Sequence, residues 1–79
     1  MMTTEEVNAW VSTAKKGEET VYYKGYFAED AFNNFEMRKF SKNLLDFEKK
    51  TGLFILYQNK IKAGDKLKQP VYEYYIRKN

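Results

Sequence analysis

The chain opens with hydrophobic residues at the spacing of one helical face. The positions that share this face are Val7, Trp10, Val11 and Ala14. Ahead of them, Thr3 and Glu6 have the spacing of a capping box, in which each side chain accepts from the other residue's backbone N–H. Gly17 is the kind of residue that ends a helix, and it follows two lysines, Lys15 and Lys16. The pattern predicts a first helix that ends at Gly17, with Trp10 as the anchor of its buried face.

A strand and a helical stretch come next. Thr20–Lys24 is a short run of β-branched and aromatic residues closed by Gly25, which is typical of a strand of about five residues. The hydrophobic spacing of Ala28–Thr51 is helical, but asparagines near its middle leave open either one kinked helix or two helices. We expect two helices, a short one and a longer one, that separate near residues 34–37. Gly52 is expected to end the second.

The last third of the chain alternates hydrophobic and polar residues, as strands do. Leu53–Ile61 begins as an apolar run and then alternates, and Val71–Arg77 alternates for most of its length. The segment Lys62–Pro70 between them is predicted to be a hairpin loop, because Gly64 and Asp65 form a turn signal.

Aromatic residues make up 18% of the chain, with seven Tyr, six Phe and one Trp. Each large ring can bury about 150–250 Å², so a few of them supply most of a small core. Tyr72 and Tyr74 share a strand face with Ile76 and are expected in the core. Tyr57 and Tyr75 are the candidates for exposure, where tyrosines serve protein interfaces or base stacking.

Composition excludes several kinds of chemistry. The 79 residues have room for a single domain, residues 1–79. The absence of Cys and His removes disulfides, thiol nucleophiles, imidazole bases and the usual zinc ligands. No glycine-rich phosphate loop is present, and nothing in the spacing of acids such as Glu29 and Asp30 demands Mg²⁺. We therefore expect no enzymatic activity, no cofactor and no metal.

No targeting or membrane segment is expected either. The first six residues are polar and acidic, unlike a secretory signal. The longest apolar run, Leu53–Tyr57, is far shorter than the about 20 residues that cross a bilayer. These features predict a protein of the cytoplasm that does not enter membranes.

Charge is divided unevenly between the two halves. Residues 1–36 contain three lysines and seven acids, a net charge of −4, whereas residues 37–79 contain eleven Lys and Arg and four acids, a net charge of +7. Such asymmetry is a feature of polyanion-binding proteins, although small proteins also scatter charge by chance.

On a helix from Met37 to Thr51, the basic residues and one amide occupy a face about 140° wide. These residues are Arg38, Lys39, Lys42, Asn43, Lys49 and Lys50, with Asp46 among them. Leu45 lies outside both this face and the apolar face, and is expected to pack against a neighbouring element.

The expected order of helix, strand, helix, helix, strand, loop, strand is that of a winged helix-turn-helix. This is an α+β fold with a small antiparallel sheet whose last hairpin forms the wing. Several residues also match a known family: Trp10, Gly17-x3-Val21-Tyr22-x2-Gly25-Tyr26-Phe27-Ala28-x-Asp30, Gln58 and Tyr72-Glu73-Tyr74-x2-Arg77-Lys78. In these residues the chain resembles small winged helix-turn-helix proteins of tailed phages, most of which have no assigned function. Where those proteins commonly have a strongly basic residue beside Gln58, this chain has Asn59, and Lys60 follows.

In winged-helix proteins the third helix usually enters the major groove, and the wing contacts phosphate or the minor groove. The resemblance therefore implies a DNA-binding protein, a regulator of phage transcription or DNA metabolism that works in the host cytoplasm as a monomer or homodimer. The predicted DNA-binding residues are Arg38, Lys39, Lys42, Asn43 and Lys49 on the helix and Lys60, Lys62, Lys66 and Lys68 on the wing. Because only Arg38, Asn43 and Lys42 have base-reading geometry, phosphate contacts are expected to dominate binding to double-stranded DNA.

Two other interpretations stay open. A solvated amphipathic helix has the same polar face, and lysines near an edge strand also discourage unwanted pairing. A different function is that of a small module that docks on a host protein and modulates it, with the acidic first half as the contact or as a nucleic-acid mimic. Salt separates the two functions, because DNA binding weakens steeply as salt rises and an apolar protein interface does not.

Overall fold

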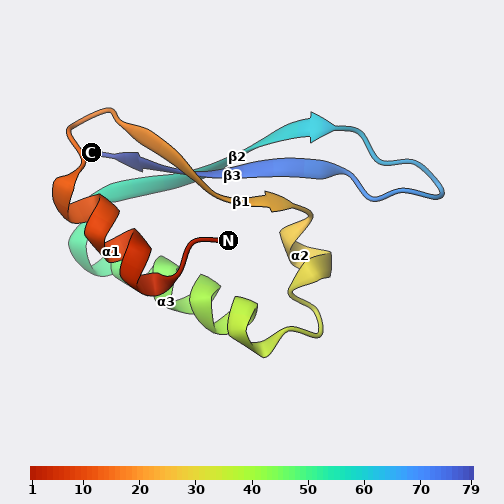
Figure 1. Ribbon diagram of the computed structural model, residues 1–79, viewed down its shortest axis with the longest axis horizontal. Coiled ribbons are helices and arrows are strands. Elements are labelled where there is room, and N and C mark those ends of the chain that lie inside the picture. The colour runs from red at the N-terminus through yellow and green to blue at the C-terminus, as the bar shows by residue number, and fades with distance from the viewer.

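Three helices and three strands follow one another along the chain in the predicted order (Figure 1). The computed structural model describes residues 1–79. The elements are α1 (Thr4–Thr13), β1 (Glu19–Gly25), α2 (Phe27–Asp30), α3 (Phe35–Thr51), β2 (Phe54–Lys62) and β3 (Val71–Lys78). The α+β class and the small antiparallel sheet are confirmed.

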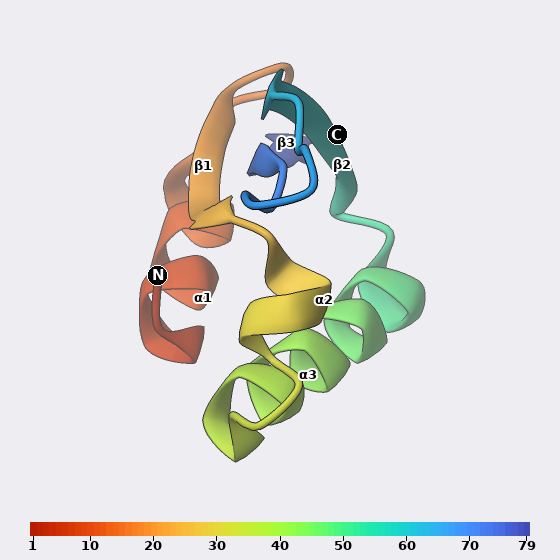
Figure 2. The same cartoon turned by 90° about the vertical axis from the view of Figure 1, so that its right-hand side faces the viewer.

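The sheet places its last strand in the middle, in the order β1-β3-β2, with β3 antiparallel to both neighbours. Ile76 pairs with Thr20 on one side and with Leu56 on the other. All three helices lie on one side of this arched sheet, and the other side is uncovered (Figure 2). The β2–β3 hairpin extends beyond the helices at one end of the molecule (Figure 1).

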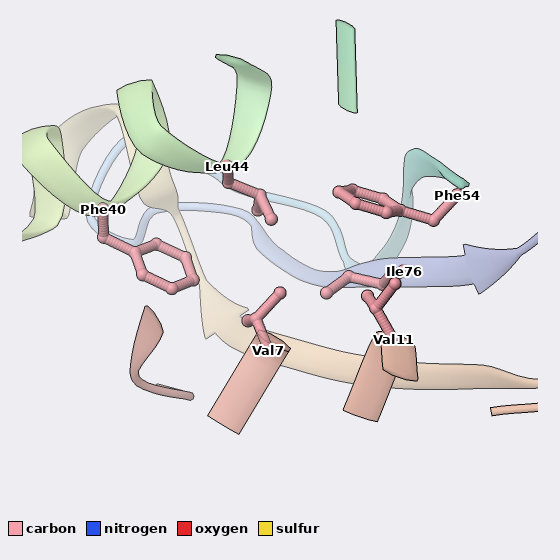
Figure 3. Packing of buried hydrophobic residues seen from close by; sticks show 6 residues of the cluster. All are labelled: Val7, Val11, Phe40, Leu44, Phe54 and Ile76. Atoms are coloured by element: carbon pink, nitrogen blue, oxygen red, sulfur yellow. The ribbon is translucent and has the colours of Figure 1, made fainter. Parts of the chain in front are cut away.

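The core lies between the sheet and the helices α1 and α3. Figure 3 shows its six buried side chains, which come from both helices, from the start of β2 and from β3: Val7, Val11, Phe40, Leu44, Phe54 and Ile76. The expectation that Trp10 anchors α1 is wrong in its detail. Trp10 is half-buried and packs against this cluster from its edge, whereas the completely buried residues of α1 are the smaller Val7 and Val11.

The first helix begins as predicted and ends earlier. The backbone N–H of Thr3 donates to Glu6 Oε1 at 2.9 Å and that of Glu6 donates to Thr3 Oγ1 at 3.1 Å, which is the capping box. The helix ends at Thr13, so Lys15 lies outside it. Gly17 has φ 88° and belongs to the next turn, in which the Glu18 N–H donates to the Lys15 carbonyl at 3.0 Å. A turn of this kind needs a residue with positive φ, so Gly17 shapes the turn and does not cap the helix.

The helical stretch in the middle of the chain consists of two helices, as expected. The break covers residues 31–34, slightly before the expected position, because the Asn34 side chain caps α3 and accepts from the Met37 N–H at 3.1 Å. Gly52, at φ 62°, ends α3 in the left-handed conformation that glycine adopts most easily. Phe32 and Phe35, which continue the apolar spacing, are nevertheless 72% and 65% exposed at this corner.

The tyrosines of the sheet divide between its two faces. Tyr74 and Ile76 are buried on the helix side, as predicted, while Tyr72 is only half-buried because it lies near the projecting end of the hairpin. Tyr57 and Tyr75 pair across the strands and stack on the uncovered side, with ring centroids 4.9 Å apart and planes 5° from parallel.

Truncation of Phe54 to alanine is expected to destabilise the protein by about 3–5 kcal/mol, because the change removes a completely buried ring from the centre of the core. This is a large share of the about 5–15 kcal/mol that holds a typical domain folded. Phe32→Ala removes the same ring from an exposed site and should change stability by no more than about 0.5 kcal/mol. Urea denaturation of both variants measures the difference; equal losses would contradict this core.

Stability should also fall in alkaline solution because of Tyr22. This ring packs against Phe40 and Tyr74 with centroids 5.9 and 6.1 Å away, and burial raises the pKa of Tyr22 to about 12. The folded state therefore favours the neutral phenol. Its stabilising effect is complete below the ordinary pKa near 10 and is lost as pH rises through about 12. We expect the free energy of unfolding to fall less steeply between pH 10 and 12 in Tyr22→Phe than in the wild type, measured by denaturant titration. Parallel curves would contradict a buried Tyr22 hydroxyl.

Candidate nucleic-acid interface

Helix α3 has a buried side and a basic side. Its buried residues are Met37, Phe40 and Leu44, and the last two belong to the core that α3 shares with α1 and the sheet. The ends of the helix suit its dipole, since Glu36 lies in the first turn and Lys49 in the last. The residues on the opposite side are exposed, including every residue that the sequence predicts there for DNA: Arg38, Lys39, Lys42, Asn43 and Lys49.

The cations on this face form no ion pair within the protein. The only ion pair in the structure joins Arg77 to Glu19, with Nε 3.9 Å from Oε1, on the uncovered side of the sheet. Lys78 is also occupied, because its Nζ donates to the Val11 carbonyl at 2.6 Å. The cations of α3 have no such partner, so their charge is directed to solvent.

The exposed side of α3 borders two separate hollows. One lies beside α2 and contains three of the predicted cations: it is lined by Phe27, Arg38, Ser41, Lys42, Leu45, Asp46 and Lys49. The other lies beside the N-terminal segment and brings Lys39 and Asn43 close to Glu5 and Glu36. The structure therefore groups Arg38, Lys42 and Lys49, and places Lys39 and Asn43 on a flank with local acids. Leu45, expected to pack against a neighbour, is 43% exposed within the first hollow.

The loop of the β2–β3 hairpin, residues 63–70, has a defined shape. Asp65 Oδ1 accepts from the N–H groups of Leu67 at 2.7 Å and Lys68 at 2.8 Å, and the Asp65 N–H donates to the Lys68 carbonyl at 2.8 Å. The two sides of the loop meet at Gly64, where a Cβ would lie only 2.7 Å from Pro70 Cδ. Lys66 and Lys68 are exposed on this loop, and Lys62 is exposed at the end of β2.

Lys60 lies further down the stem of the hairpin and has a partner. Its Nζ is 5.8 Å from the centroid of the Tyr72 ring, a cation–π distance. Tyr72 in turn stacks on Tyr26, with centroids 6.0 Å apart. Lys60 thus helps to hold the base of the hairpin against the residue that precedes α2, in addition to carrying charge.

The helix cations and the loop cations occupy different parts of the molecule. The hairpin loop forms a hollow of its own at the end of the longest dimension, which is 41 Å. Figures 1 and 2 both show α2 between this loop and α3. A partner that contacts both groups has to be extended, as a nucleic-acid duplex is.

The uncovered side of the sheet is different in charge. The Tyr75 hydroxyl donates to Glu73 Oε1 at 2.9 Å, and this bond to a carboxylate raises the pKa of Tyr75. The nearby Glu19 carboxylate raises the pKa of Tyr57 to about 12. Two carboxylates therefore border the stacked tyrosines, and Arg77 beside them is paired to Glu19.

Some exposed residues of interest were not predicted from the sequence. Phe32 and Phe35 continue the apolar spacing of the helical stretch, and that spacing gives no sign of their exposure. Leu67 is the only apolar residue between Lys66 and Pro70, and that isolation in a polar loop is the signal that identifies it. No group of three or more acidic side chains gathers in a way that would hold a metal ion. No helix has both the length and the apolar character needed to cross a membrane.

Comparisons with protein-family models, with curated proteins and with solved structures find no match to this chain.

The conformation of the hairpin loop should depend on the Asp65 carboxylate. In Asp65→Ala, the N–H groups of Leu67 and Lys68 lose their acceptor. Because a net hydrogen bond is worth about 0.5–1.5 kcal/mol, we expect the exchange of these two amide hydrogens to become about 2–10-fold faster, with the melting temperature nearly unchanged. Asp46→Ala, which removes an exposed carboxylate from α3, is the control. Equal exchange rates in wild type and Asp65→Ala, measured by NMR, would contradict the capped loop.

Proposed function

We propose that this protein is a winged-helix domain that binds double-stranded DNA and catalyses no reaction. The observation that supports this proposal best is the position of the cations. They are exposed and without ion pairs on α3 and on the hairpin loop, the two elements that a winged helix presents to DNA. The order of the elements and the strand order β1-β3-β2, with a long final hairpin, are compatible with that fold. A role in phage transcription or DNA metabolism rests on the sequence resemblance.

Phosphate contacts dominate in this proposal. Each lysine or arginine that neutralises a phosphate releases condensed counterions, which favours binding to any sequence. Arg38, Lys42 and Lys49 are the strongest candidates on α3 because they border one hollow, in which Asp46 is the only acid. Glu5 and Glu36 weaken the local potential around Lys39 and Asn43. With so few residues able to read bases, the preference for sequence is modest.

Titration with random duplex DNA at two salt concentrations tests this proposal. If about six phosphates are contacted, affinity should fall roughly 10³-fold between 50 and 200 mM salt. Lys42→Glu with Lys66→Glu changes one residue on α3 and one on the hairpin loop. This double variant should lose most of the affinity and should reduce the slope of log K against log salt by about two. The two single variants measure the contribution of each element.

The chain offers a matched control for this experiment. Lys15→Glu with Lys16→Glu makes the same change in net charge in the turn between α1 and β1, outside the proposed surface. It should bind DNA with nearly the wild-type affinity, apart from the weak long-range effect of net charge. Equal losses in both double variants would show that only net charge matters and that the proposed surface is wrong. Melting temperatures close to wild type ensure that each variant is folded.

The corner between α2 and α3 favours a second candidate function, docking on a protein. Phe32 and Phe35 are both more than half exposed there, and exposed aromatic rings are common anchors in protein interfaces. Binding through them would change little with salt and would be lost in Phe32→Ala with Phe35→Ala. If that variant keeps the wild-type affinity for DNA, and if this affinity falls steeply as salt rises, the result favours DNA binding.

A further inference from the structure

The tip of the hairpin presents one apolar side chain to solvent. Leu67 is 94% exposed, the highest value among the large hydrophobic residues of the protein. It lies between Lys66 and Lys68, and its own N–H is bound by Asp65. A leucine in this position adds nothing to the core, yet the loop around it is held in a defined conformation.

We propose that Leu67 is a wedge that inserts between neighbouring base pairs from the minor groove of bound duplex DNA, and that it bends the duplex. This inference rests on the proposed DNA binding and goes beyond it, because contact with phosphates needs no apolar residue. Proteins that insert apolar side chains between base steps unstack them in part and kink the helix.

The positive charge around this tip favours a polyanion as its partner. The segment from Lys60 to Pro70 contains four lysines and a single acid, Asp65, one of whose oxygens accepts two backbone hydrogen bonds. Two larger exposed aromatic surfaces have acids beside them. Glu19 and Glu73 border the stacked tyrosines of the sheet, and acids of α2 and the first turn of α3 flank the exposed phenylalanines. Leu67, the most exposed of the large hydrophobic residues, thus lies between two lysines in a segment whose net charge is positive.

The shape of the tip fits the minor groove. That groove is about 6 Å wide, and two hydrogen-bonded strands lie about 4.8 Å apart before their side chains are counted. The stem of the hairpin therefore stays outside, and only side chains at the tip can enter. Because the Asp65 hydrogen bonds fix the backbone on both sides of Leu67, little conformational entropy is lost when it inserts.

A membrane surface also combines an apolar layer with negative charge, but it fits this tip less well. A single myristoyl chain gives only marginal attachment to a bilayer, and one leucine is much smaller. Between two base pairs, by contrast, a single side chain is enough to unstack a step.

Fluorescence of 2-aminopurine, which rises when the base unstacks, tests the proposal directly. The probe is placed at a flexible TA step in a duplex of about 25 base pairs. Saturating wild-type protein should increase the fluorescence, and Leu67→Ala should abolish the increase. Leu53→Ala removes an exposed leucine just before β2, at the end of that strand away from the hairpin loop, and should behave like the wild type. Leu67→Ala should keep the salt dependence of binding, because no cation is lost.

Affinity gives a second measurement. A single-base bulge supplies part of the unstacking in advance, so the wild type should prefer a bulged duplex by about tenfold over a matched one. In Leu67→Ala this preference should fall below about twofold. Salt-dependent binding without a rise in fluorescence would overturn the wedge and leave DNA binding intact. No binding to the duplex at 50 mM salt would overturn both. Capture by phosphatidylserine vesicles that depends on Leu67, with no unstacking of DNA, would also overturn the wedge.

Discussion

The arrangement of the molecule depends on the burial of β3 between its two neighbours. Ile76 is completely buried in the middle of this strand, with β1 and β2 paired on either side and the helices beneath. The same strand fastens the rest of the chain. The Lys78 N–H donates to the Glu18 carbonyl, the Gly17 N–H donates to the Lys78 carbonyl, and the Tyr74 hydroxyl accepts from the Phe27 N–H at 2.9 Å. Through these bonds β3 fixes the turn after α1 and the start of α2.

This central position also decides which charges face which way. Residues of β3 alternate between the two sides of the sheet, so Glu73, Tyr75 and Arg77 lie on the uncovered side while Tyr74 and Ile76 face the helices. The acids that border the stacked tyrosines are therefore kept away from the basic side of α3. The hairpin, in turn, can project beyond the helices because its base is paired to β1 and packed against Tyr26. The acids of the sheet and the cations of α3 are therefore separated because of the way in which the residues of β3 alternate between the two sides of the sheet.

Local signals in the sequence were sufficient where the physics is local. The capping box of Thr3 and Glu6, the left-handed Gly52 and the alternation in the last two strands depend on neighbouring residues, and each was found where expected. The basic face of α3 could be predicted because periodicity and charge coincide there. The structure confirms that these residues are exposed. Their role in DNA binding stays a prediction.

The errors arose where tertiary packing decides the outcome. Gly17 suits a helix end and a tight turn equally well, and the connection to β1 determined which it formed. Trp10 was centred on its face, but β3 and Phe54 fill the space beneath the smaller Val7 and Val11 and leave the indole at the edge. Phe32 and Phe35 have helical spacing, yet α2 ends after one turn and no element covers the corner. Sequence periodicity identifies a face, and only the fold shows what covers it.

The number of ion pairs bears on why the cations lie where they do. The chain has 14 cations and 11 acids, enough to form many pairs, and forms one. Exposed pairs contribute only about 0–1 kcal/mol each, so leaving them unformed costs the fold little. Stability therefore places almost no constraint on where exposed lysines lie, in contrast to Phe54 or Ile76, whose positions it dictates. Folding therefore does not require the concentration of unpaired cations on one helix face and one shaped loop, and a negatively charged partner is the explanation that we propose for it.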